Sequence, residues 1–188
     1  MLKFGNTFVN VGGTYLTGIV NEHYDDTEVQ IGSQIWMKRN LTYDDGKGGI
    51  RHTTPFDLTE WGEQYYYTWD AANRVANKIE GWRLPTIEDW NTLINYVGTN
   101  PAYKLKSTSG WFNNQNGSDE YGFCVLPTEY YKSTIYGGFH AYFWSSTPGE
   151  WPSEGTYWSY VFDRDDRVYG AYHADPNNLY TIRLIKDI

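Results

Sequence analysis

The sequence predicts an α+β fold, with two helices in its first half and strands with long loops in its second half. Residues 69–79 and 86–97 each place apolar side chains at the spacing of one helical face. After Pro101 no helical period continues, and short aromatic runs alternate with Gly, Asn, Asp, Ser and Pro. Helices and strands therefore do not alternate as in a βαβ protein, and an irregular antiparallel sheet is expected.

Each predicted helix has its own start signal. Asp70 is placed to act as the N-cap of the first helix, and Thr86 as the N-cap of the second. Asp89 adds a negative charge to the first turn of the second helix, and Gly98 is expected to end that helix.

The length of 188 residues suits one domain that carries a short extension. Residues 1–28, which are rich in Gly, Thr, Val and Asn, predict a short β-rich N-terminal extension. Residues 29–188 are assigned to the domain. Within it, residues 29–41 predict a strand that leads into the core, and residues 44–49 predict a turn.

Aromatic residues are unusually frequent in this chain. It has 18 Tyr and 9 Trp at a mean hydropathy of -0.65, more rings than one core is expected to hide. Tyr and Trp combine a large apolar body with a polar tip, so they suit binding surfaces. A role in core packing stays open for any single ring.

Charge and hydropathy exclude several classes of partner. The net charge of -8 argues against nucleic acid or an anionic membrane as the main partner, because both attract basic surfaces. No apolar run approaches the roughly 18 residues of a membrane span, so no membrane insertion is expected. The first twenty residues do not form the apolar core of a signal peptide, and no export signal is expected in the chain as given.

The residues that usually carry catalysis are sparse or dispersed. The single cysteine, Cys124, excludes an internal disulfide and a multi-cysteine metal site. Four histidines lie at spacings that put no two on one helical face: His23, His52, His140 and His173. No phosphate cradle or nucleophile elbow is present. We therefore expect no catalytic residue, no metal and no cofactor.

The acidic cluster at residues 163–166 admits two interpretations. Asp163, Asp165 and Asp166, interleaved with Arg164 and Arg167, could bind calcium or act in acid–base chemistry. The favoured interpretation is a solvated loop of mixed charge.

The run GWRLPT at residues 81–86 is the sharpest local signal. Trp82 and Leu84 can seat the segment against the core while Arg83 pairs with carboxylates and Thr86 begins a helix. We interpret the run as a structural strand-to-helix turn.

Several runs occur in an order that is similar to one known family. They are IGSQIWM (31–37), YTWDAA (67–72), GWRLPT (81–86), LKSTSGW (105–111), NGSDEYGF (116–123) and FWSST (143–147). Over about residues 29–187 the chain resembles the Fibrobacter succinogenes major paralogous domain, a bacterial and phage domain. The resemblance implies a C-type-lectin-like fold.

The resemblance also implies that the chain is a variable protein of a diversity-generating retroelement. In those systems randomised template adenines turn AAY codons into many residue types, but never into Trp, Met, Lys, Gln or Glu. Between residues 147 and 181 the chain is rich in residue types that such codons yield. The variable, ligand-binding face implied there comprises Tyr157, Ser159, Asp163, Asp165, Asp166, Tyr169, Tyr172, His173, Asp175, Asn177, Asn178 and Tyr180.

The chain departs from two relatives of this fold. The EPN and QPD triplets of calcium-dependent animal lectins are absent, so calcium-dependent sugar binding is not expected. The GWRLP stretch also resembles formylglycine-generating enzymes and related oxygenases, which need a cysteine pair or a histidine-rich iron site. With Cys124 alone and dispersed histidines, an oxidase is the least favoured reading.

The expected function is therefore non-enzymatic binding of a protein or glycan receptor on a cell surface, from a virion, extracellular or cell-surface location. The alternative is an adhesin of fixed specificity, or a structural component of a virion or cell envelope. In that case residues 1–28 would pair between subunits and form a homo-oligomer.

Overall fold

The fold belongs to the α+β class, as the sequence predicted. The computed structural model describes residues 28–53, 64–128, 138–149 and 155–186, and residues 1–27 of the predicted extension lie outside them. The described residues form three α-helices: α2 (Trp69–Ala76), α3 (Ile87–Val97) and α4 (Pro101–Leu105). A single-turn 3-10 helix, η1, spans Phe112–Asn114. The strands are β1 (Glu28–Ile31), β2 (Gln34–Met37), β3 (Ile50–Thr53), β4 (Gln64–Tyr67), β5 (Trp82–Arg83), β6 (His140–Pro148), β7 (Tyr157–Asp163), β8 (Val168–Ala174) and β9 (Ile185–Lys186).

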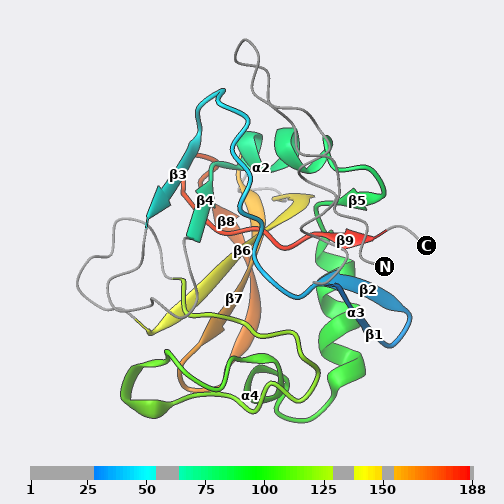
Figure 1. Ribbon diagram of the computed structural model, residues 1–188, viewed down its shortest axis with the longest axis vertical. Helices are drawn as coiled ribbons and strands as arrows, with labels where there is room; N and C mark the ends of the chain where they lie inside the picture. The colour runs from blue at the N-terminus through cyan, green and yellow to red at the C-terminus, as the bar shows by residue number, and fades with distance from the viewer. Residues whose placement is uncertain (1–27, 54–63, 129–137, 150–154, 187–188) are drawn as a thin grey trace, which may run out of the picture.

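These strands form three sheets in which every pair is antiparallel. The first sheet has the order β1-β2-β9-β5, so the beginning and the end of the described chain lie side by side (Figure 1). The second is the pair β3-β4, and the third has the order β6-β7-β8. In the third sheet β7 is the central strand, so its backbone is hydrogen-bonded to β6 on one side and to β8 on the other.

The two predicted helices are present, but the first has a different N-cap. Thr68, in an extended conformation, accepts a hydrogen bond from the backbone nitrogen of Ala71, whereas Asp70 already lies inside the first turn of α2. The N-cap expected at Asp70 was therefore wrong by two residues. For α3 the cap at Thr86 and the end at Gly98 are confirmed.

Two local elements differ from the expected ones. Residues 29–41 were expected to form one strand, but the chain reverses at Gly32, whose φ is 61°, and makes the hairpin β1–β2. The two-residue connection needs this left-handed conformation. Helix α4, absent from the sequence prediction, begins at Pro101 after Asn100 and is only five residues long.

The core consists of two apolar clusters, one around each of the longer helices. Trp90 of α3 is fully buried and packs on Trp36, Phe143 and Tyr160. The other cluster surrounds α2, whose buried residues include Ala72 and Val75. The strand β6 supplies Phe143 to the first cluster and Trp144 to the second, so the third sheet joins the two.

Candidate functional site

The hairpin β7–β8 carries most of the predicted binding residues. Tyr157 at the start of β7 pairs with Ala174 at the end of β8, and Phe162 pairs with Val168 near the turn. We call residues 163–167 the turn end, and Tyr157 with residues 173–178 the loop end. Because each strand has seven residues, the two ends lie roughly 20 Å apart. The predicted face is therefore divided between two separate places.

At the turn end, each carboxylate has a partner within the domain. Asp163, which is only 2% exposed, accepts hydrogen bonds from the backbone nitrogen and Nε of Arg167 at 3.0 and 2.7 Å. Asp165 accepts from Nε2 of Gln115 at 3.1 Å. Asp166 pairs with Nζ of Lys106 at 2.6 Å.

Lys106 is the central group of the turn end. Its side chain is fully buried, and Nζ donates to the carbonyl oxygens of Gln115, Asp163 and Arg164 at 2.9, 3.3 and 3.0 Å. The ammonium also lies 4.6 Å from the centre of the Trp111 ring. This lysine therefore holds the β7–β8 turn against the segment that follows α4.

The loop end is built around a stacked aromatic pair. The rings of Trp69 and Tyr157 lie 3.6 Å apart with an angle of 13° between their planes. Trp69 Nε1 donates to the Ser145 carbonyl oxygen at 2.9 Å, and the Trp69 backbone nitrogen donates to the carbonyl of Pro176 at 3.0 Å. The first residue of α2 thus contacts β6, β7 and the loop that follows β8.

Residues 175–178 form a tight turn beyond this pair. Oδ1 of Asp175 accepts from the backbone nitrogen of Asn177 at 2.8 Å and from its Nδ2 at 3.0 Å. Nδ2 of Asn178 donates to the hydroxyl of Tyr180 at 3.0 Å. The Asp175 carboxylate bonds only to Asn177 among the contacts of the described chain, and both residues are exposed.

The predicted residues differ widely in exposure. The exposed ones are Asp165, Asp166, Tyr169, His173, Asp175 and Asn177, whereas Tyr157 and Asn178 are half-buried. Ser159, Asp163 and Tyr180 are buried. Ser159 lies on the central strand β7, and Asp163 forms the ion pair with Arg167. Tyr180 packs against the rings of Tyr142 and Trp144. These three side chains are not displayed. The side chain of Tyr172 lies outside the described residues.

A β-bulge changes the pairing beside the loop end. Tyr157 pairs with Ala174 and Ser159 with Ala171, so residue 158 of β7 opposes two residues of β8, Tyr172 and His173. Bulges bend a strand and redirect its side chains. Here the bulge lies in the stretch that leads to the exposed His173.

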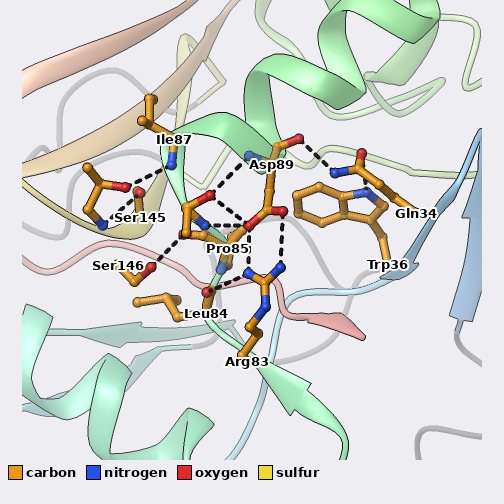
Figure 2. A network of polar contacts seen from close by, with 11 residues as sticks. Gln34, Trp36, Arg83, Leu84, Pro85, Ile87, Asp89, Ser145 and Ser146 are labelled. Atoms are coloured by element: carbon orange, nitrogen blue, oxygen red, sulfur yellow. Dashed lines mark hydrogen bonds and ion pairs between the residues drawn. The ribbon is translucent and has the colours of Figure 1, made fainter. Parts of the chain in front are cut away.

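The GWRLPT run forms the junction between β5 and α3, as interpreted from the sequence (Figure 2). Nη1 and Nη2 of Arg83 donate to the two carboxylate oxygens of Asp89 at 2.6 and 3.1 Å. The same carboxylate accepts from the backbone nitrogen and hydroxyl of Thr86, which completes a capping box. Burial opposes ionisation of Asp89, but the Arg83 and Thr86 hydrogen bonds outweigh it and lower its pKa.

This junction also fixes the end of β6 that leads to the loop end. The backbone nitrogen of Ser146 donates to the Pro85 carbonyl at 2.8 Å, and the backbone nitrogen of Ile87 donates to the Thr147 hydroxyl at 2.9 Å. Since Ser145 of the same strand bonds to Trp69, the α3 junction and the aromatic pair belong to one connected framework.

Sequence reasoning missed two residues that organise the site, Trp69 and Lys106. Both lie outside residues 147–181, where the search for the face was made. Each belongs to a run that carries the family resemblance, YTWDAA or LKSTSGW. A tryptophan at a helix start was an available signal, whereas Lys106, between Leu105 and Ser107, has no local signal of its burial.

Candidate reactive groups in the described part of the chain include potential metal ligands, the free thiol and a buried arginine. No three His, Cys, Asp or Glu residues there are grouped to hold a metal ion. Cys124 is a half-buried free thiol, and burial raises its pKa. Arg183 is fully buried beside it, donates to Asn40 at 2.6 Å, and has its pKa lowered to about 10 by burial.

Comparison with known proteins identifies the family. Residues 29–186 match the model of the Fibrobacter succinogenes major domain. Because this match covers most of the chain, the protein belongs to that family. Neither the curated proteins nor the solved structures include a match to this chain. Among the described residues, no helix is both long enough and apolar enough to span a membrane.

Proposed function

We propose that this protein is a non-enzymatic binding protein whose loop end contacts a receptor and is diversified by a retroelement. One observation carries the proposal. His173, near the end of β8, and Asp175 and Asn177, in the turn that follows it, are exposed, while Ser159, Phe162 and Asp163 of the adjacent strand β7 are buried. An exposed polar loop on a packed framework can change its side chains while the backbone is held.

We include in this proposal the C-type-lectin-like fold that the family resemblance implies. Two features support it: the pairing of β2 with β9, which brings the chain ends together, and a separate antiparallel sheet that carries the long C-terminal loops. The aromatic pair of Trp69 and Tyr157 gives the loop end an apolar surface beside its amides and carboxylate. Aromatic rings with adaptable polar groups are the usual composition of variable binding surfaces.

Catalysis by the single thiol is disfavoured by its burial. Burial raises the pKa of Cys124, which lowers the thiolate fraction at neutral pH. The net charge of -8 favours a neutral or basic partner. The proposed partner is a protein or glycan receptor on a cell surface, and the proposed location is a virion or the outside of a cell.

The test is to sequence the DNA that flanks the gene. The proposal expects a near-copy of the codons for residues 143–188, differing only where the copy has adenine, next to a reverse transcriptase frame. Absence of a copy in complete flanking sequence would contradict diversification. A binding protein of fixed specificity would then be the better account.

A structural role is the second candidate, and the position of β1 favours it. This strand lies at the edge of its sheet, with β2 as its only neighbour among the described strands, and it directly follows residues 1–27. An edge strand can pair with a neighbouring subunit. The test is to delete residues 1–27 and to determine the oligomeric state from the mass by light scattering. A fall from an oligomer to a monomer supports assembly through the extension, and an unchanged oligomeric state contradicts it.

A further inference from the structure

We infer that specificity is confined to the exposed residues of the loop end, and that Asp163, Asp166 and Gly170 are fixed parts of the framework. This inference rests on the proposed function and narrows it. All three residue types are products of an AAY codon, and Asp163 and Asp166 belong to the variable face predicted from the sequence. The contacts of the structure separate them from it.

Asp166 is fixed by charge. Nζ of Lys106 is buried, and among the described residues Asp166 is the carboxylate that pairs with it, at 2.6 Å. A neutral residue at position 166 would leave a buried ammonium bonded only to carbonyl oxygens. An uncompensated buried charge is among the most destabilising defects in a folded protein.

Asp166 is also fixed by its backbone. Its φ is 62°, in the left-handed region, which Asn, Asp and Gly adopt far more readily than other residues. Many products of a diversified codon, such as Val, Ile and Thr, would be strained there. Charge and backbone conformation therefore restrict this position independently.

Asp163 closes the same turn. It is buried, and its two carboxylate oxygens accept separate hydrogen bonds from the backbone nitrogen and Nε of Arg167. Its backbone nitrogen donates to the Arg167 carbonyl at 3.0 Å. No side chain other than a carboxylate of this length would accept both bonds and balance the guanidinium.

Gly170 is fixed by space. A Cβ atom at this position would lie 3.0 Å from Cδ1 of Ile87 and 3.0 Å from Cζ3 of Trp158. Both side chains pack in or against the core around α3. Even a methyl group there requires the Trp158 ring or the Ile87 side chain to shift by a few tenths of an ångström.

At the loop end, neither Asp175 nor Asn177 has a positive φ or pairs with a buried charge. Asp175 and Asn177 bond to each other, and this Asx turn also accepts Asn, Ser or Thr in place of Asp175. His173 is exposed and lies within the bulge, where residues 172 and 173 oppose residue 158. We therefore assign specificity to His173, Asp175 and Asn177.

Two matched libraries of the full chain test this inference. One randomises codons 163, 166 and 170, and the other randomises codons 173, 175 and 177. Both are displayed on yeast, and the fraction of clones that resist protease is measured. Because exposed substitutions change stability little while buried charges and overpacking change it strongly, we expect at least about tenfold more resistant clones from the loop-end library. Equal fractions would overturn the inference.

Single variants separate the charge argument from general misfolding. Asp166→Ala should lower the melting temperature, and the double variant Asp166→Ala with Lys106→Met should recover part of that loss because the unpaired ammonium is removed. Asp175→Ala is the matched control and should leave the melting temperature nearly unchanged. A double variant that is less stable than Asp166→Ala alone would contradict the role given to Lys106.

The outcomes also separate the inference from the proposed function. If the gene has a template copy whose mismatches include codons 163, 166 or 170, the inference fails while diversification stands. If no copy exists but the libraries still differ as expected, diversification fails, and the division between framework and tolerant loop remains.

Discussion

Asp89 and Asp175 perform the same local task in two very different surroundings. Each accepts a hydrogen bond from a backbone nitrogen close by in the chain, that of Thr86 or that of Asn177. Asp89 is also held by the Arg83 guanidinium and lies in the first turn of α3. Asp175 is exposed, and its other bond is to the side chain of Asn177.

The difference separates a part of the molecule whose contacts join several elements from a part whose contacts are local. At the α3 junction, the helix cap and the Arg83 ion pair both depend on the Asp89 carboxylate. Because Ser146 of β6 donates a hydrogen bond to Pro85 of this junction, we expect a substitution of Asp89 to disturb β6 as well. At the loop end, the bonds of Asp175 stay within one turn. A change there should remain local.

The largest effect should come from the core beneath the junction. Trp90→Ala removes a fully buried ring that packs on Trp36, Phe143 and Tyr160, and we expect a loss of about 3–5 kcal/mol in the free energy of unfolding. Urea denaturation measures it. The control is Tyr169→Ala, since Tyr169 is 45% exposed and should change stability by less than about 1 kcal/mol. Similar losses in both variants would remove the distinction between core and displayed rings.

The next effect should come from the junction itself. Asp89→Ala removes the capping box, worth about 1 kcal/mol, and an ion pair worth up to about 1 kcal/mol because the Arg83 side chain is partly exposed. We expect a total near 2 kcal/mol by chemical denaturation. The matched variant Asp175→Ala should lose less than about 1 kcal/mol. If Asp175→Ala were the more harmful change, the comparison of the two aspartates would be wrong.

A smaller effect should appear as a dependence on pH. The pKa of Asp89 is lowered in the folded protein, so its contribution is present above the unfolded value of about 3.9 and is lost as pH falls through the folded value. The stability difference between the wild type and Asp89→Asn should therefore shrink below about pH 4. Denaturation curves at pH 7 and pH 3 measure it, and a difference that grows on acidification would contradict the sign.

The smallest effect should come from the loop end. Asp175→Asn keeps an oxygen that can accept from the backbone nitrogen of Asn177, so we expect a change within about 0.5 kcal/mol. The melting temperature at neutral pH is a sufficient measurement. A fall of many degrees would mean that this loop supports the fold.

The sequence predicted what depends on local patterns. Helical spacing and the Thr86 cap located α3, and the GWRLPT turn with its Arg83 pairing was interpreted correctly. Helix α4 was missed because five residues contain little more than one turn and show no period. The hairpin β1–β2 was missed because its turn is only Gly32 and Ser33.

The division of the site between two ends could not be read from the sequence. Asp163 and Asp175 are the same residue type in similar surroundings of polar and turn residues. What separates them is burial, together with Lys106, which reaches the turn end from 57 residues away in the chain. Trp69 likewise meets Ser145 across 76 residues. Such contacts follow from the tertiary fold and not from local composition.

The most direct test of the central claim is to observe variation as it arises. A single clone that carries the gene with its native flanking DNA is grown, and codons 143–188 are sequenced in many descendants. The account predicts substitutions concentrated at codons 173, 175 and 177, with codons 163, 166 and 170 unchanged. Substitutions spread evenly over the gene, or concentrated at the turn end, would contradict it.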